Sequence, residues 1–331
     1  MLRQVFIVLD FSLAALATDF RPTRATVILR QLKDFVTRFF DQNPLGSLGL
    51  ISTKEKKASI ISPMSSNARV TINVIEEMEK QLADDADQYC LSEPSCQMSL
   101  TKAFSYLGSQ AKYFSKEIIL VMNSLKSCDI SNLKDTAKML RNDSVKCNII
   151  HLSAQVELYQ QLAKETGGEM IVPKNENEID QIFIRLSKPV ILEDDHDASA
   201  STMIKMGFPS FLKNSNSSKY RMTTNTSSST NDLSHTNQLS TEGYECPQCG
   251  LNVTSIPVQC PTCNLQLVTA PHLARSHHHL FPVPKFTETI EDSTCSSCGV
   301  GNIKVTKNPE SDNCFCLDCE IFMREKLHFS F

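Results

Sequence analysis

Four Cys-x-x-Cys pairs near the end of this chain restrict its fold more than any other feature of the sequence. Thirteen of the 331 residues are cysteines, and nine of these lie between Cys246 and Cys319. One such pair offers two thiolates from a single tight turn, and two pairs complete the tetrahedral ligand set that zinc prefers. The spacing therefore predicts small zinc-bound modules in this part of the chain.

The first two pairs predict one closed zinc site, whose ligands are Cys246, Cys249, Cys260 and Cys263. Because the protein fills all four positions, no place remains for a catalytic water, so this zinc is expected to be structural. A thioredoxin-like redox pair is the alternative, but the βαβ pattern of such proteins is missing around it. The segment 270–282 carries four histidines, which are expected to pack and to form hydrogen bonds because no acidic partner accompanies them.

The last two pairs predict a second four-cysteine site, formed by Cys295, Cys298, Cys316 and Cys319. Cys314 stands apart from these pairs. A further metal ion would need Cys314, His328 and two more ligands that the sequence does not provide. Two zinc ions per chain are therefore expected.

The first half of the chain alternates short apolar runs with segments of helical periodicity. Strands are predicted at 5–9, 47–52, 58–61, 118–122, 145–152 and 169–172, and helices at 26–40, 67–82, 96–107, 132–141, 157–165 and 176–186. In the second helix, Val70, Val74, Ile75 and Met78 are expected to face the core. Strands without polar alternation are buried on both faces of a sheet, with helices as crossovers. Residues 1–190 are therefore expected to form an α/β domain with a doubly wound, mostly parallel sheet.

From residue 191 to 242 this pattern gives way to a low-complexity linker. Of the 31 residues in 212–242, 19 are Ser, Thr or Asn. The segment therefore has too few apolar residues to offset the entropy of ordering the chain. An apolar island at 203–209 interrupts the linker and is apolar enough to dock on something, unless it is a stray patch in a disordered segment. Residues 243–285 are expected to form the first zinc finger together with the histidine segment, and residues 286–331 are expected to form a truncated zinc module.

Composition excludes several classes of protein. The 41% hydrophobic fraction can fill a sizeable core, but no apolar run is long enough to span a membrane. Residues 241–331 contain 6 Lys and Arg against 10 Asp and Glu, and two zinc ions on eight thiolates add a charge of about −4. Fingers that bind nucleic acid need a basic face, so direct nucleic-acid binding is not expected and proteins are the expected partners. The four scattered cysteines of the first half indicate a reducing compartment.

Five motifs occur in order along the chain. They are Phe39-Phe40-Asp41-Gln42-Asn43-Pro44, Thr166-Gly167-Gly168, Met206-Gly207-Phe208-Pro209, Gly243-Tyr244-Glu245-Cys246-Pro247-Gln248-Cys249 and the segment 270–282. In this order they resemble the suppressor-of-stem-loop family of subunits of the general transcription factor IIH (TFIIH) core. The resemblance covers nearly the whole chain outside the linker.

This resemblance implies a fold and a role for each part of the chain. The first domain is similar to von Willebrand factor A domains and is expected to bind and stimulate the XPD-type helicase of the complex. The tail resembles a four-cysteine finger followed by a RING-like domain, and is expected to hold a smaller von Willebrand A-type subunit and other core subunits. A nuclear protein without enzymatic activity is implied, acting in transcription initiation by RNA polymerase II and in nucleotide excision repair. A RING-type ubiquitin ligase and a proteasome-type von Willebrand A receptor are the alternatives.

The chain departs from the family pattern in its metal motifs. Metal-binding von Willebrand A domains use Asp-x-Ser-x-Ser, whereas Asp10-Phe11-Ser12-Leu13-Ala14 lacks the third oxygen and Asn123 replaces a later Asp. Tight Mg²⁺ binding is therefore not expected, and Asp10 and Ser12 are expected to cap a neighbouring helix and loop. In the RING-like part, Asn308 and Ser311 replace the second ligand pair and the fourth is cut short after His328. The chain also begins almost on its first strand, without the extension usual in the family, so that either the extension is dispensable here or the start codon is misassigned.

The loops at the carboxyl ends of the strands are the default place for binding in such sheets. This nominates residues 11–21, 93–95 and 124–129 as helicase contacts, with Asp129 as the charge to reverse. The sequence shows no credible nucleophile, acid–base pair or phosphate loop, and Gly167-Gly168 reads as a helix stop. We therefore expect a protein that binds other proteins and catalyses no reaction.

Overall fold

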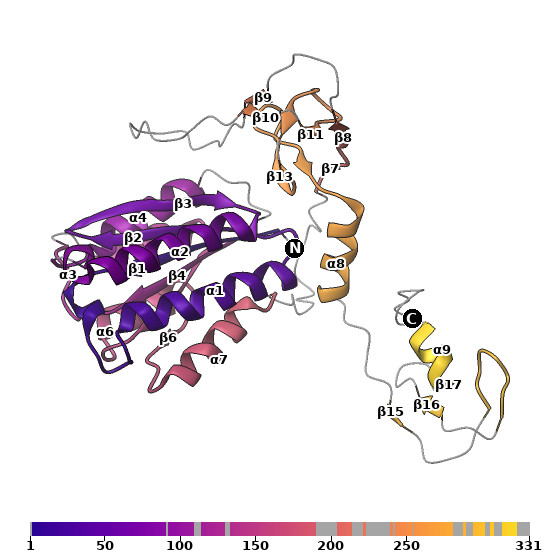
Figure 1. The fold of residues 1–331 in the computed structure, drawn as a ribbon, viewed down its shortest axis with the longest axis horizontal. Coiled ribbons are helices and arrows are strands. Elements are labelled where there is room, and N and C mark those ends of the chain that lie inside the picture. The colour runs from indigo at the N-terminus through magenta and orange to yellow at the C-terminus, as the bar shows by residue number, and fades with distance from the viewer. Residues whose placement is uncertain are drawn as a thin grey trace. The chain divides into compact units, whose positions relative to one another are not determined.

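Buried strands assemble into a six-stranded sheet with the order β3-β2-β1-β4-β5-β6 (Figure 1). The strands are β1 Arg3–Asp10, β2 Ser47–Lys54, β3 Lys57–Ser65, β4 Ser115–Met122, β5 Val145–His151 and β6 Met170–Ile171. All neighbouring strands are parallel except β3, which a tight turn joins to β2. Glu55 and Lys56 in this turn have φ values of 51° and 62°, as two-residue hairpin turns require. The predicted doubly wound, mostly parallel sheet is confirmed.

This computed structural model describes residues 2–90, 92–108, 114–129, 133–189, 204–213, 221–222, 239–240, 242–253, 255–280, 287–288, 294–301, 305–307 and 313–322. The chain divides into two compact units, Met1–Ser276 and His277–Phe331. Within the described residues, every helix is too short or too polar to cross a bilayer.

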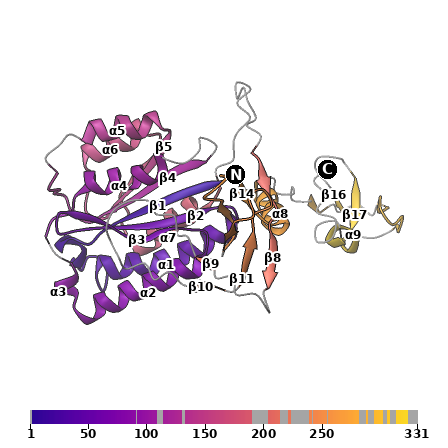
Figure 2. The same ribbon diagram turned by 90° about the horizontal axis from the view of Figure 1, so that it is seen from above.

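Helices cover both faces of the sheet (Figure 2). One layer contains α1 Arg24–Gln42, α2 Ala68–Asp84 and α7 Glu176–Ser187, and the other contains α4 Cys96–Gly108, α5 Leu133–Asn142 and α6 Glu157–Glu165. Two short helices, η1 Leu13–Leu16 and α3 Ala86–Tyr89, form where the sequence predicts none.

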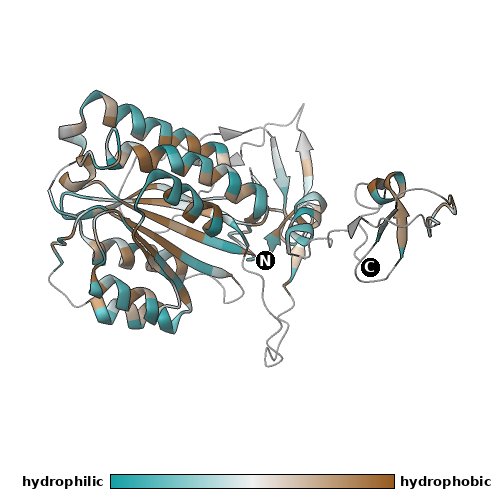
Figure 3. Cartoon of the chain, turned by 90° about the horizontal axis from the view of Figure 1, so that it is seen from below, coloured by the Kyte–Doolittle hydropathy of each residue, from teal (hydrophilic) through white to brown (hydrophobic). Residues whose placement is uncertain are grey.

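The two layers explain why the central strands are apolar at every position. In β1, Val5, Ile7 and Leu9 belong to the core under the first layer, whereas Phe6 and Val8 belong to the core under the second. Both faces are therefore out of contact with water, and Figure 3 shows the resulting concentration of hydrophobic residues along the sheet.

Helix ends follow local signals in the sequence. The side chains of Thr23, Asn67 and Asn175 cap α1, α2 and α7 by accepting a hydrogen bond from a backbone N–H of the first turn. After α6, Gly167 adopts a φ of 72°, and a Cβ atom on Gly168 would lie 1.9 Å from the carbonyl oxygen of Cys147. The predicted role of these two glycines as a helix stop is confirmed.

One predicted core position is wrong. Val70 is 44% exposed, whereas Ile75 and Met78 are buried as expected. The buried stripe of α2 runs through Thr71, Ile75, Met78 and Leu82, one position away from Val70. A buried threonine at the start of the helix hides this stripe from a search for apolar residues.

Short strands form the region around the first two cysteine pairs, which we call the first finger. β11 Glu242–Glu245 pairs with β12 Asn252–Val253, and β13 Val258–Gln259 pairs with β14 Gln266–Leu267. Strands β7 Met206–Gly207 and β8 Ser210–Lys213 join these two sheets, so the apolar island docks on the finger, as expected. β9 Arg221–Met222 pairs with β10 Leu239–Ser240, and α8 Ala270–Leu280 follows the finger.

The second unit contains the sheet β15-β16-β17 and one helix. Its elements are β15 Thr287–Glu288, β16 Val305–Lys307, β17 Cys314–Cys316 and α9 Leu317–Phe322. Asn308, Ser311 and His328, which the comparison with RING domains singled out, lie outside the described residues.

Candidate functional site

The four cysteines of the first finger converge on one point. Their sulfur atoms all lie within 4.8 Å of one another, with 3.6 Å between Cys246 and Cys263 and 3.5 Å between Cys249 and Cys260. A tetrahedral ion with metal–sulfur bonds near 2.3 Å holds its sulfurs about 3.8 Å apart. The cysteines are not in disulfides. Their arrangement suits a closed site that could hold a metal ion.

Three of the Cys-x-x-Cys turns share one backbone geometry. In each, the backbone N–H of the first cysteine donates to the carbonyl oxygen of the residue five positions later. The carbonyl oxygen of the same cysteine accepts a hydrogen bond from the N–H four positions later, and these bonds are 2.8–2.9 Å long. The residue after the second cysteine has a positive φ: 71° at Gly250, 57° at Asn264 and 73° at Gly299. Glycine and asparagine tolerate this conformation best. The sequence prediction overlooked these three residues, although they directly follow the pairs.

Backbone N–H groups surround the sulfurs and favour their ionised form. Burial alone would raise the pKa of Cys246, but N–H groups of Cys249 and Gln248 lower it to about 7. At Cys295, N–H groups of Cys298 and Cys316 likewise outweigh burial and lower the pKa to about 6. Metal ligation requires the thiolate, and this environment favours it at Cys246 and Cys295. Neighbouring sulfurs and burial instead raise the pKa of Cys249, Cys263, Cys298 and Cys319, so ionisation of these four thiols would depend on a bound cation.

The second predicted ligand set also comes together in space. The sulfurs of Cys295, Cys298, Cys316 and Cys319 lie within 4.8 Å of one another. Cys298 and Cys316 are 3.7 Å apart, and the N–H of Cys316 donates to the sulfur of Cys295 over 3.3 Å. Cys314 does not belong to this group of four. The structure therefore presents two four-cysteine clusters that could each hold a metal ion.

Asp10, at the end of β1, connects two loops. Its carboxylate accepts hydrogen bonds from the backbone N–H groups of Ser12 and Asn123, both at 2.8 Å, and of Ser124, at 2.9 Å. Burial raises its pKa, although these bonds oppose the rise. Asp10 has the predicted capping role, and the backbone N–H groups that it caps belong to the loops after β1 and β4. Ser12 stands at the N-cap of η1 without a side-chain capping bond.

A buried arginine links the same edge of the sheet. Arg24 donates through Nη1 to the carbonyl oxygen of Asn123 at 3.0 Å and to Oγ of Ser153 at 2.6 Å. Its Nε and Nη2 atoms bind the two carboxylate oxygens of Asp19 at 2.7 and 2.6 Å, which lowers the pKa of Asp19. The guanidinium thereby joins the loops after β1, β4 and β5. The sequence gives no sign of this role, because an exposed Asp–Arg pair would look the same.

The sequence profile of the Ssl1-like family matches residues 8–209, more than half of the chain. The chain belongs to this family. Proteins named General transcription factor IIH subunit 2 are 32% identical in Dictyostelium discoideum, covering 99% of this chain and 68% of the relative, and 30% identical in Caenorhabditis elegans, covering 99% and 82%. General transcription and DNA repair factor IIH subunit ssl1 of Schizosaccharomyces pombe is 27% identical, covering 99% and 77%. The resemblance to the suppressor-of-stem-loop family is confirmed.

Solved structures with a similar fold include two single domains. The SpRpn10 VWA domain is 15% identical with a TM-score of 0.46, covering 57% of this chain and 96% of that one. The TFIIH p34 N-terminal domain is 13% identical with a TM-score of 0.46, covering 56% and 97%.

The three nominated loops of this Ssl1-like chain form one continuous edge at the carboxyl ends of the strands. The N–H of Leu13 donates to the carbonyl oxygen of Ser92 at 3.3 Å, and that of Cys128 donates to Pro94 at 3.1 Å. Two large apolar side chains of this edge face solvent: Leu13 is 60% exposed and Leu125 is 58% exposed. The edge therefore combines a braced backbone with unburied apolar surface. We call it the carboxyl edge.

Asp129 stabilises the carboxyl edge through hydrogen bonds, so its substitution is a poor test of binding at the surface of this edge. Its carboxylate accepts from Oγ of Ser95 at 2.5 Å and from the N–H of Gln97 at 2.9 Å, and it also binds Oγ of Ser127. It thus holds the start of α4. Charge reversal at Asp129 would break these bonds, so Leu125 is the better residue to change.

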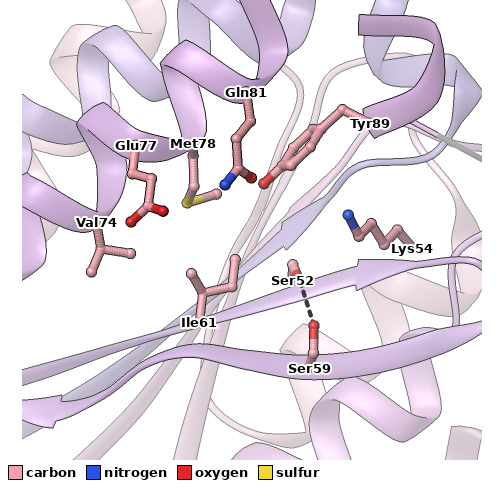
Figure 4. A pocket seen from close by; sticks show the side chains of 9 residues that line it. All are labelled: Ser52, Lys54, Ser59, Ile61, Val74, Glu77, Met78, Gln81 and Tyr89. Atoms are coloured by element: carbon pink, nitrogen blue, oxygen red, sulfur yellow. Dashed lines mark hydrogen bonds between the residues drawn. The ribbon is translucent and has the colours of Figure 1, made fainter. Parts of the chain in front are cut away.

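A hollow of about 260 Å³ lies between the β2–β3 hairpin and α2 (Figure 4). The hydroxyls of Ser52 and Ser59 bind each other at 2.8 Å, and Nζ of Lys54 lies 4.2 Å from the ring centre of Tyr89. Burial raises the pKa of Tyr89 to about 12. The other lining residues are Ile61, Val74, Glu77, Met78 and Gln81. The lining therefore combines apolar side chains with hydroxyl, amide and charged groups.

The histidine-rich segment forms α8. Nδ1 of His272 lies 2.8 Å from Oγ1 of Thr269, and burial lowers the pKa of this half-buried imidazole. His277 and His278 are exposed. The ring of His278 lies 5.9 Å from that of His279. The prediction that the histidines pack and form hydrogen bonds is thus confirmed for His272.

Proposed function

We propose that this chain is a structural and regulatory subunit of the TFIIH core that catalyses no reaction. It would act in the nucleus, in transcription initiation by RNA polymerase II and in nucleotide excision repair. The supporting observation is similarity along 99% of the chain to proteins named General transcription factor IIH subunit 2. A tagged copy expressed in its own cells should co-purify with the TFIIH core, and purification with unrelated partners would contradict the proposal.

Within this role, the carboxyl edge is the proposed binding surface for the XPD-type helicase. Parallel α/β sheets bind ligands and partners beyond the carboxyl ends of their strands. Here Leu13 and Leu125 are more than half exposed on loops that hydrogen bonds hold in place. An apolar side chain presented by a rigid loop loses little entropy on binding, so it can contribute strongly to affinity.

Leu125→Arg tests this surface. The variant should fold, because Leu125 is already 58% exposed, but it should bind the helicase about tenfold or more weakly and lose stimulation of its ATPase. Val70→Arg on α2 is the matched control, since Val70 is 44% exposed and lies near the opposite end of the parallel strands. The measurement is titration of purified helicase with each full-length variant. Equal affinity for Leu125→Arg and wild type would contradict the proposed surface.

We further propose that each four-cysteine cluster holds one structural zinc ion. The sulfur spacing, the lowered pKa values of Cys246 and Cys295, and the absence of a non-protein ligand position in either set of four favour zinc. The ions would cross-link turns that have little apolar core of their own, and would take no part in a reaction.

Zinc content is the direct measurement. Wild-type protein should carry about two zinc ions per chain, and Cys260→Ser should carry about one, because three thiolates hold zinc weakly. Cys128→Ser is the control, since Cys128 is half-buried, lies outside both clusters and should retain both ions. A wild-type content near one, or two ions in Cys260→Ser, would contradict the assignment.

The zinc modules are the proposed contacts for the smaller von Willebrand A-type subunit and for other core subunits. In the second unit, Val300, Leu317 and Ile321 are 47%, 63% and 43% exposed. Leu317 and Ile321 are four residues apart on α9 and share one helical face. The excess of acidic over basic residues in 241–331 favours protein partners over nucleic acid.

A further inference from the structure

The apolar island belongs to a longer segment, Ile204–Lys213, that contacts both cysteine turns of the first finger. We call it the docking segment. Its strand β8 pairs antiparallel with β11, which leads into the turn at Cys246. Its strand β7 pairs parallel with β14, which follows the turn at Cys260, and the N–H of Val268 donates to the carbonyl oxygen of Gly207 at 3.0 Å. The docking segment therefore adds one strand to each of the hairpins that carry the ligands.

Gly207 shows how closely the docking segment fits. It is buried, and a Cβ atom at this position would lie 2.6 Å from Cδ2 of Leu265 and 3.0 Å from Cγ of Pro247. Pro247 belongs to the first cysteine turn, and Leu265 follows the second and donates its N–H to the sulfur of Cys263. A single glycine thus lies against both halves of the metal cluster.

The docking segment has a second apolar contact. Ile204 and Met206 pack against a buried cluster that consists of Leu2, Leu45, Phe114 and Val268. The first three precede β1, β2 and β4, at the amino ends of the parallel strands. Outward-facing side chains of the segment are different, since Phe208 is 58% exposed. The inward side of the segment is therefore fixed by packing, whereas Phe208 on its outer side is free of such packing.

We propose that the docking segment is a built-in part of the first zinc site, so that zinc binding and docking of the segment stabilise each other. Zinc fixes the two turns whose hairpins pair with β7 and β8, and the docked strands hold the turns in the geometry that zinc needs. Anything that binds only the ordered form of a site stabilises that form, and the effect is reciprocal. The inference rests on the zinc occupancy proposed above.

The pairing of β8 with β11 also means that the Ser/Thr/Asn tract does not simply link the first domain to the finger. Lys213 and Glu242 face each other across β8 and β11, so the chain leaves the finger and returns to it at neighbouring points. The tract between them is an insertion within the zinc module. The connection from the first domain to this module is the shorter stretch before Ile204.

Gly207→Val in the full-length protein tests the coupling. The added methyl groups would meet Leu265 and Pro247, so zinc of the first cluster should pass to a coloured chelator, 4-(2-pyridylazo)resorcinol, about tenfold faster or more. The zinc of the second cluster should leave at the wild-type rate. Phe208→Ala is the matched control, because it removes an exposed neighbour without a clash, and it should release both ions as wild type does.

The converse measurement follows the docking segment itself. Hydrogen exchange of peptides from 204–213 should rise when the chelator removes zinc, together with exchange of 258–268. Gly207→Ala, a smaller change, keeps the test valid if the valine variant fails to fold and should give an intermediate release rate. Wild-type zinc content with unchanged release in both Gly207 variants would overturn this proposal alone. A wild-type first cluster without zinc would overturn the zinc assignment as well.

Discussion

At the scale of single residues, the carboxyl edge shows how a few side chains can hold several loops together. The carboxylate of Asp10 receives three backbone N–H groups, and Arg24 spans three loops with a guanidinium that is nearly buried. A fixed side-chain cation and fixed N–H dipoles thus do locally what a bound divalent ion does elsewhere: they hold several loops at set distances. A partner that binds this edge therefore meets loops that hydrogen bonds already hold in place.

His151, beside this brace, gives the edge a pH dependence. Its imidazole is fully buried, and Nδ1 accepts hydrogen bonds from the N–H groups of Ser153 and Ala154 at 3.2 Å, which the protonated ring could not do. Burial, reinforced by the charge of Arg24, lowers its pKa below the ordinary value of 6.5. The unfolded chain therefore takes up a proton near pH 6.5 that the folded chain refuses. The free energy of unfolding should fall as the pH drops below 6.5.

Urea unfolding of wild type and His151→Phe at pH 7.5 and pH 5.5 checks this prediction. Wild type should lose more stability between the two values than the variant does. The raised pKa of Asp10 acts in the opposite direction, because its protonation favours the folded state, but it is present in both proteins and drops out of the comparison. An equal pH dependence in the two proteins would show that His151 does not control it.

At the scale of elements, the sequence predicts regular structure well where the physical signal is local. Apolar runs mark the central strands because both faces of the sheet are covered, and α6, Glu157–Glu165, has the bounds that its periodicity indicates. The failures have a different cause. Thr71 replaces Val70 in the buried stripe of α2, and the two-residue strand β7 depends on a partner about sixty residues away. Composition around 204–213 cannot reveal such a distant pairing.

The cysteine clusters show the same division between local and distant information. Pair spacing is enough to group eight cysteines into two sets of four, because each turn brings its own two sulfurs together. The N–H groups that lower the pKa of Cys246 and Cys295 follow from the turn geometry, so Gly250 and Gly299 could be added to the prediction. The contact of Gly207 with Leu265 could not be predicted, since neither sequence segment carries a signal that indicates the other.

At the scale of the whole molecule, two kinds of stabilisation coexist in one chain. Residues 1–189 bury two continuous apolar cores, one on each face of the sheet, and also an ion pair between Arg3 and Glu117 that binds the end of α7. In the described parts of the cysteine modules, only a few residues are buried around each cluster. Burial of apolar surface stabilises the first region, whereas the modules would depend on the metal ligation proposed above.

Removal of metal should therefore affect the two regions very differently. With excess chelator at neutral pH, the thermal transition of residues 1–189 should shift by less than about 5 °C, which corresponds to roughly 1–2 kcal/mol in a domain of this size. A small shift is expected because the docking segment packs against Leu2, Leu45 and Phe114 of the first domain, and these contacts would weaken when metal is removed. Hydrogen exchange should instead become fast throughout 242–268 and 294–322. Loss of the transition of residues 1–189 would mean that the metal modules hold the first domain together, and full protection of the two cysteine regions would mean that they fold without metal.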